Sequence, residues 1–159
     1  MNKKNSKGFT LIETLVYLGL FSIIMVGVIA ASFAIFESNG RSQTKSLLQE
    51  EGNFLLAKIN YALSSAKSVS VSATNLDITK SDLSHSIFSL PGTILQLGGV
   101  NLNNSNVSVG LTPPSTAIFT HSGVGTPVES VTTSFTLTTK TPNGQTYKQN
   151  FQTTKYLRK

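Results

Sequence analysis

The chain has 159 residues, enough for one modest domain with an appended segment. It contains no cysteine, which excludes disulfides, thiolate metal sites and cysteine nucleophiles. The formal charge is +6, but Lys3, Lys4 and Lys7 supply half of it, which favours a topology signal over a nucleic-acid-binding surface.

Residues 1–8 are polar and basic and end in glycine, whereas no charged residue occurs from Thr14 to Phe36. This run of about 23 residues would measure roughly 35 Å as a helix, enough to cross a hydrocarbon core of about 30 Å. The preceding lysines predict a cytoplasmic N-terminus and an extracytoplasmic C-terminal part, as in a single-pass inner-membrane protein. An ordinary secretory signal is the alternative, because residues 30–32 resemble a signal-peptidase site.

Glu13 lies among apolar residues at the start of this run. A carboxylate inside a bilayer costs about 3 kcal/mol, so it usually has a partner or lies near an interface. Cleavage after Gly8 would give Phe9 a free α-amino group one helical turn from Glu13. Pairing of that amine with Glu13 of a neighbouring chain would fix the axial register of an assembly. A snorkelling interfacial carboxylate with no role in assembly is the simpler alternative.

The N-terminal motif reads Lys7-Gly8-Phe9-Thr10-Leu11-Ile12-Glu13 and is followed by a long apolar helix. It resembles the leader and methylation motif of type IV prepilins and of the pseudopilins of type II secretion and competence systems. The resemblance implies cleavage between Gly8 and Phe9 by a prepilin peptidase, N-methylation of Phe9, and an assembly salt bridge made by Glu13. It also implies partners, namely other pilin or pseudopilin subunits, an inner-membrane assembly platform and the membrane. Motif and helix cover about the first third of the chain.

Two features of the family's main subunits are missing. Glu129 is the only acidic residue after Asp82, so the C-terminal acidic cluster through which major pseudopilins often bind calcium is absent. The C-terminal disulfide loop of many pilins is absent too, because the chain has no cysteine. These departures predict a minor subunit, and no metal or cofactor is expected.

Four segments are predicted in chain order. A leader occupies 1–8, a transmembrane or filament-core helix 9–36, an amphipathic helix 37–66 and a β-rich extracytoplasmic domain 67–159. The predicted fold class is therefore α+β and pilin-like, with a long N-terminal helix packed against a C-terminal antiparallel sheet.

The amphipathic helix is predicted from apolar residues that recur on one face, with Leu47 and Phe54 alongside; the face comprises Leu48, Leu55, Ile59 and Ala62. Asn39-Gly40 and Gly52 are weak points at which the helix is expected to bend or break.

Short strands are predicted over 68–73, 76–79, 87–90, 93–97, 106–109, 116–120, 128–140 and 146–155. The clearest hairpin joins the last two strands through Pro142-Asn143-Gly144, because Asn-Gly tolerates positive φ.

Candidate catalytic groups are few. Asp77 and Asp82 have no obvious partner, and His85 and His121 lie alone without metal-ligand spacing. Ser84-His85-Ser86 and His121-Ser122 lack an acid that would orient a triad, so no enzyme is predicted.

The last thirty residues carry cations and no acid; the cations are Lys140, Lys148, Lys155, Arg158 and Lys159. With the aromatic residues between them they would suit a DNA-contacting face, but lysines that protect a strand edge are the simpler interpretation. The sequence therefore predicts a filament subunit that serves secretion, DNA uptake or pilus biogenesis. A membrane-anchored binding module that does not polymerise and a tethered enzyme are the alternatives.

Overall fold

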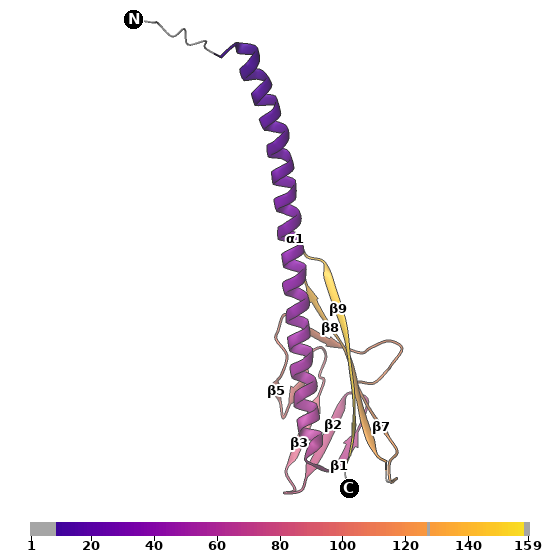
Figure 1. Cartoon of the computed structure of the whole chain (residues 1–159). Coiled ribbons are helices and arrows are strands. Elements are labelled where there is room, and N and C mark those ends of the chain that lie inside the picture. The colour runs from indigo at the N-terminus through magenta and orange to yellow at the C-terminus, as the bar shows by residue number, and fades with distance from the viewer. Residues whose placement is uncertain (1–8, 127, 158–159) are drawn as a thin grey trace, which may run out of the picture. The chain divides into compact units, whose positions relative to one another are not determined.

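The computed structural model describes residues 9–126 and 128–157 (Figure 1). By internal contacts the chain divides into two compact units, Met1–Gly40 and Arg41–Lys159. The described part contains one helix, α1 (Leu11–Ser64), followed by strands that all lie in the second unit. These are β1 (Ala66–Val71), β2 (Asn75–Lys80), β3 (His85–Ser89), β4 (Gln96–Leu97), β5 (Val100–Asn101), β6 (Ser108–Gly110), β7 (Phe119–Ser122), β8 (Ser130–Lys140) and β9 (Thr146–Tyr156). The predicted α+β fold class is confirmed.

Every residue from Leu11 to Ser64 is helical, so the break expected at Asn39-Gly40 and at Gly52 does not occur. A glycine costs a helix only about 1 kcal/mol relative to alanine. The hydrogen bonds and packing of the residues on either side offset this cost.

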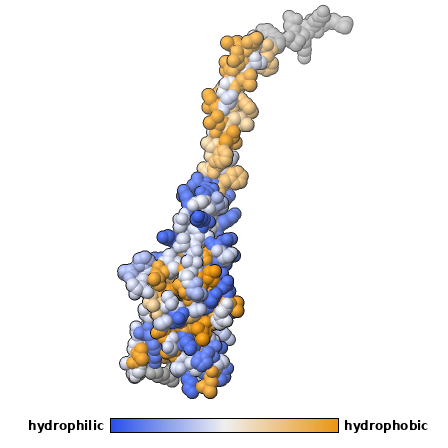
Figure 2. Space-filling model, turned by 180° about the vertical axis from the view of Figure 1, so that it is seen from behind, coloured by the Kyte–Doolittle hydropathy of each residue, from blue (hydrophilic) through white to orange (hydrophobic). Residues whose placement is uncertain are grey.

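Within the first unit, residues 14–36 of α1 are uncharged and predominantly apolar. The large apolar side chains of residues 11–36 are exposed, from 43% at Met25 to 79% at Leu11, and Figure 2 shows the hydrophobic surface that they form. By length and composition this helix is able to cross a membrane. Such a surface requires a bilayer or other apolar helices around it.

In the second unit α1 buries one face in the core, as the periodicity predicts; its buried residues are Thr44, Leu48, Gly52, Leu55, Ile59, Ala62 and Leu63. Leu47 and Phe54 lie outside this face and are 46% and 45% exposed. The core is completed by apolar side chains from both sheets, among them Leu76, Phe88 and Phe135.

The strands form two antiparallel sheets. The first has the order β1-β2-β3-β4-β5, so that β1 and β5 are its edges. In the second, β8 pairs with β9 along its whole length on one side and with β6 and β7 on the other. The predicted hairpin between the last two strands is confirmed, and Gly144 in its loop has a φ of 77°.

The middle of the domain differs most from the sequence prediction. The strand expected over 93–97 is reduced to β4, and β5 was not predicted. The Leu95 N–H donates to Asn103 Oδ1 at 2.7 Å, and the Leu95 carbonyl accepts from the Leu102 N–H at 2.8 Å. Gly98 and Gly99 adopt φ values of 58° and 84° and turn the chain directly from β4 into β5.

Gly52 is explained by close packing. A Cβ atom at this position would lie 2.2 Å from the ring of Phe151 in β9. That ring is buried and stacks on Phe135 with the centroids 5.7 Å apart, so it has little room to move. The helix and the sheet approach each other closely here because residue 52 has no side chain.

We therefore expect Gly52→Ala to lower the free energy of unfolding by about 1–3 kcal/mol through overpacking, although alanine is the better helix former. Urea unfolding of the full chain in detergent, followed by circular dichroism, measures this change. Adding Phe151→Leu should restore part of the loss. Gly27→Ala is the matched control, because a Cβ there meets nothing within 4 Å. A Gly52→Ala protein as stable as the parent would contradict the packing account.

Candidate functional site

Thr10 caps the N-terminus of α1. The Glu13 N–H donates to the Thr10 carbonyl at 3.1 Å and to the Thr10 hydroxyl at 3.3 Å, and the Thr14 N–H donates to the same carbonyl at 3.2 Å. A threonine followed three residues later by glutamate is the sequence pattern of a capping box. The helix therefore begins within two residues of Phe9, and Glu13 lies in its first turn.

Glu13 shares one side of the helix with two aromatic residues. The Tyr17 hydroxyl donates to Glu13 Oε1 at 3.3 Å, and the rings of Phe9 and Tyr17 meet edge to face with centroids 6.1 Å apart. The spacing of four residues between Phe9, Glu13 and Tyr17 places all three along one face. Because 3.3 Å is long for an O–H···O bond and a carboxylate accepts several bonds, Glu13 retains capacity for a stronger donor.

Of the predicted site residues, the structure therefore places Phe9 and Glu13 at the capped end of α1, and Phe9 is 74% exposed. Gly8 lies outside the described residues. The predicted cut between Gly8 and Phe9 and the N-methylation of Phe9 stay predictions.

Two residues of this site were not singled out from the sequence, Thr10 and Tyr17. Both had a readable signal: Thr10 stands three residues before Glu13 in the capping-box pattern, and Tyr17 follows Glu13 by one helical turn.

The second unit brings each histidine next to an acid, so the prediction that His85 and His121 lie alone is wrong. His85 Nδ1 lies 3.0 Å from Asp77 Oδ1 on adjacent strands, with both side chains substantially exposed. His121 Nε2 lies 2.6 Å from Glu129 Oε1, and these side chains are only 13% and 12% exposed. The second contact is not aligned as a hydrogen bond, so it attracts through charge when the ring is protonated.

Asp82 also has a partner, in contrast to the prediction. Its Oδ1 accepts from the N–H of Ser84 at 2.9 Å and from the Ser84 hydroxyl at 2.6 Å. These two donors hold the pKa of the Asp82 carboxyl below its usual value. The group closes the turn between β2 and β3, which is a structural role.

A nucleophile is not aligned with either histidine. Among the residues that the structure describes, no hydrogen bond joins a serine or threonine hydroxyl to the ring of His85 or His121. An acid that orients a histidine is one part of a triad, and the activated hydroxyl is the other.

Comparison with protein families finds a match to the prokaryotic N-terminal methylation motif over residues 3–29. No curated protein and no solved structure matches the chain. The match includes Gly8, the last residue of the predicted leader, and Phe9, Thr10, Glu13 and Tyr17 of the capped helix end.

We expect Thr10→Ala to loosen the start of α1, because it removes the hydroxyl that accepts from the Glu13 N–H. Loss of such a cap costs about 1 kcal/mol, which corresponds to roughly fivefold faster exchange of the Glu13 amide hydrogen. Nuclear magnetic resonance of the protein in micelles measures this rate. Thr10→Ser keeps the hydroxyl and should exchange like the parent; equal rates for all three proteins would refute the cap.

Proposed function

We propose that this chain, whose N-terminal segment is type IV prepilin-like, is a minor pilin or pseudopilin. It is a structural subunit of a type IV pilus-like filament, is processed by a prepilin peptidase, and assembles through its N-terminal helix. The observation that carries the proposal is the coincidence of the methylation motif with a capped, uncovered apolar helix that holds Glu13 in its first turn.

The exposed apolar helix supports membrane anchoring before assembly. Burying apolar area stabilises by about 25 cal/mol per Å², so a helix that exposes every large apolar side chain of residues 11–36 partitions strongly into lipid. In a filament the same surface would be covered by the helices of neighbouring subunits. The basic leader favours retention of the N-terminus in the cytoplasm.

Glu13 supplies the register of assembly in this proposal. Among the described residues only Tyr17 donates to its carboxylate, and this weak bond does little to offset the loss of water in hydrocarbon. The α-amine that cleavage creates on Phe9 of a neighbouring subunit is a cation at the matching depth. Pairing the two is favourable in one axial stagger and leaves both charges uncompensated in others.

The basic C-terminal residues give little support to DNA as a partner. Along β9 exposed and half-buried positions alternate, so Lys148 and Lys155 point to opposite faces of the strand. Cations on opposite faces do not form one basic stripe, and Arg158 and Lys159 of the predicted set lie outside the described residues. They suit an edge strand that is protected against aggregation, which β9 is. Secretion and pilus biogenesis are therefore favoured over direct DNA contact.

The proposed role is mechanical and not catalytic. A membrane-anchored binding module that does not polymerise is the second candidate, because the same helix would anchor it. Processing at Gly8 and crosslinking to other pilin subunits favour the filament subunit, whereas turnover by the isolated protein would favour a tethered enzyme.

Processing gives the first test. Mass spectrometry of the protein extracted from membranes should find a chain that begins at Phe9 with a methylated amine. Gly8→Ala, or a bulkier residue, should abolish the cut and leave the leader in place. A product that begins after residues 30–32 would identify an ordinary signal peptide, and an untrimmed chain in cells that process other prepilins would overturn the proposal.

The pairing of Glu13 gives the second test. Glu13→Ala should leave membrane insertion intact, since it removes a costly charge, and should lower incorporation into filaments roughly tenfold or more. Quantitative immunoblotting of sheared filaments and of membranes measures both. Glu13→Gln is the matched control, because it keeps the shape and removes only the charge. Normal incorporation of Glu13→Gln would show that charge pairing is not required.

A further inference from the structure

The outer face of the second sheet carries polar side chains in register. Val131, Phe135 and Leu137 of β8 are buried in the core, so the alternate residues of this strand face outward. On that outer face hydroxyl and amide side chains are cross-strand neighbours: Thr120 with Thr132, Thr132 with Thr154, and Ser134 with Gln152. Strands β7, β8 and β9 thus present hydroxyl and amide groups on one surface.

A groove of about 400 Å³ lies between this face and the loop that joins β6 to β7. The strands contribute Thr120, Thr132, Ser134 and Gln152 to its lining, and the rest comes from the loop and its end: Thr112, Pro113, Pro114, Ser115, Ala117 and Ile118. None of these described lining residues is charged. The size falls within the range of about 300–1,000 Å³ that is typical of binding sites.

The loop that forms one wall of the groove is held in place by its own hydrogen bonds. The hydroxyls of Thr112 and Thr136 lie 3.2 Å apart, within hydrogen-bond distance. The Ser115 N–H donates to the Thr112 carbonyl at 2.8 Å, and the Ser115 hydroxyl donates to the Ala117 carbonyl at 2.7 Å. The two prolines between them have a fixed φ. A ligand would therefore meet a preformed groove and would not have to order the loop.

Two side chains in the groove keep their hydrogen-bonding capacity for a ligand. Within the described residues, neither the Ser134 hydroxyl nor the Gln152 side-chain amide has a hydrogen-bond partner. The hydroxyls of Thr132 and Thr154, in contrast, lie 2.9 Å apart and pair with each other. A hydroxyl donates and accepts, and an amide offers two donors and an acceptor. The groove thus presents neutral donors and acceptors side by side.

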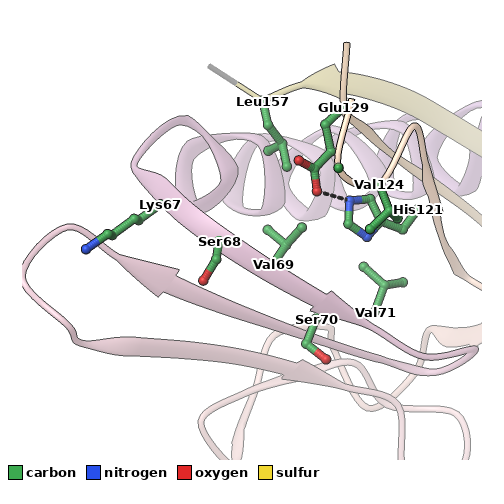
Figure 3. Close-up of a pocket in the computed structure, with 10 residues that line it drawn as sticks. Lys67, Ser68, Val69, Ser70, Val71, His121, Val124, Glu129 and Leu157 are labelled. Carbon is green, nitrogen blue, oxygen red and sulfur yellow. Dashed lines mark ion pairs between the residues drawn. The ribbon is translucent and has the colours of Figure 1, made fainter. Parts of the chain in front are cut away.

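A cavity beside β1 differs from this groove in its charged lining. Figure 3 shows His121 and Glu129 of that cavity directed toward each other, and His121 Nε2 lies 2.6 Å from Glu129 Oε1. The charged groups there face each other, whereas Ser134 and Gln152 face the open groove. The groove is therefore the better candidate for a ligand site.

We propose that the groove binds a neutral saccharide. Each sugar hydroxyl donates and accepts a hydrogen bond, which matches the free groups of Ser134 and Gln152. The C–H face of a sugar ring packs against apolar surface such as the rings of Pro113 and Pro114. An anionic ligand would lose its water without gaining a cation from the lining. This inference goes beyond the filament role and does not rest on it.

Nuclear magnetic resonance of the full-length protein, in a detergent without sugar groups, tests the site. The neutral probes are maltotriose, cellotriose and tri-N-acetylchitotriose, and trigalacturonate is the charged probe. We expect at least one neutral probe to shift the side-chain amide signal of Gln152, with a Kd on the order of 1 mM. Trigalacturonate should bind at least fivefold more weakly. The side-chain amide of Gln96, which donates to Asn101 in the other sheet, is the internal control.

Substitutions in the groove test the two free groups. Gln152→Leu and Ser134→Val remove the hydrogen-bonding atoms and keep an approximate size, and each should weaken binding about fivefold, as expected for one lost hydrogen bond. Thr138→Val is the matched control, because Thr138 lies on the same face of β8 but does not line the groove. Absence of binding by all neutral probes, equal or tighter binding of trigalacturonate, or unchanged binding by both groove variants would overturn the proposal.

Discussion

A single helix that meets two different environments is the constraint on which the rest of the structure depends. In α1 the large apolar side chains of residues 11–36 are all exposed, whereas from Thr44 to Leu63 one face is buried. A helix satisfies its own backbone hydrogen bonds, so it can pass from hydrocarbon into a water-exposed domain without leaving main-chain groups unpaired. Only the side-chain pattern has to change. This explains why no break is needed at Asn39-Gly40, whereas Gly52 matters for packing because the Phe151 ring leaves no room for a side chain there.

The same constraint makes the position of Glu13 unusual. Had α1 been a helix of a soluble domain, an acid in its first turn next to a Thr10 cap would be ordinary, because it complements the helix dipole. Here that turn opens an apolar surface whose side chains are all exposed, so the surroundings that cover them also cover the acid. The Tyr17 hydroxyl satisfies one of several acceptor positions, and weakly. A carboxylate whose acceptor positions are only partly occupied favours association with a group that donates a stronger hydrogen bond.

Features set by local periodicity could be predicted from the sequence, and features set by strand register could not. The apolar run, the buried face at Leu48 and Leu55 and the Asn143-Gly144 hairpin all follow from spacing or turn chemistry, and the structure confirms them. From the sequence Gly52 is expected only to weaken the helix. Its role in packing could not be predicted, because the residue that it contacts lies in a distant strand. The pairs His85–Asp77 and His121–Glu129 form between strands or segments that a turn connects. The Ser- and Thr-rich sequence does not fix the strand register there, because apolar and polar residues alternate only weakly along it.

What is particular to this chain lies in the β domain, because the methylation motif covers only residues 3–29. The apolar run within the motif requires only length and hydropathy, so many sequences would serve there. The β domain depends instead on specific contacts, such as that of Gly52 with Phe151 and that of the Asn103 side chain with Leu95. A substitution at such a contact would change the stability of the domain and would leave the helix end that carries Glu13 intact.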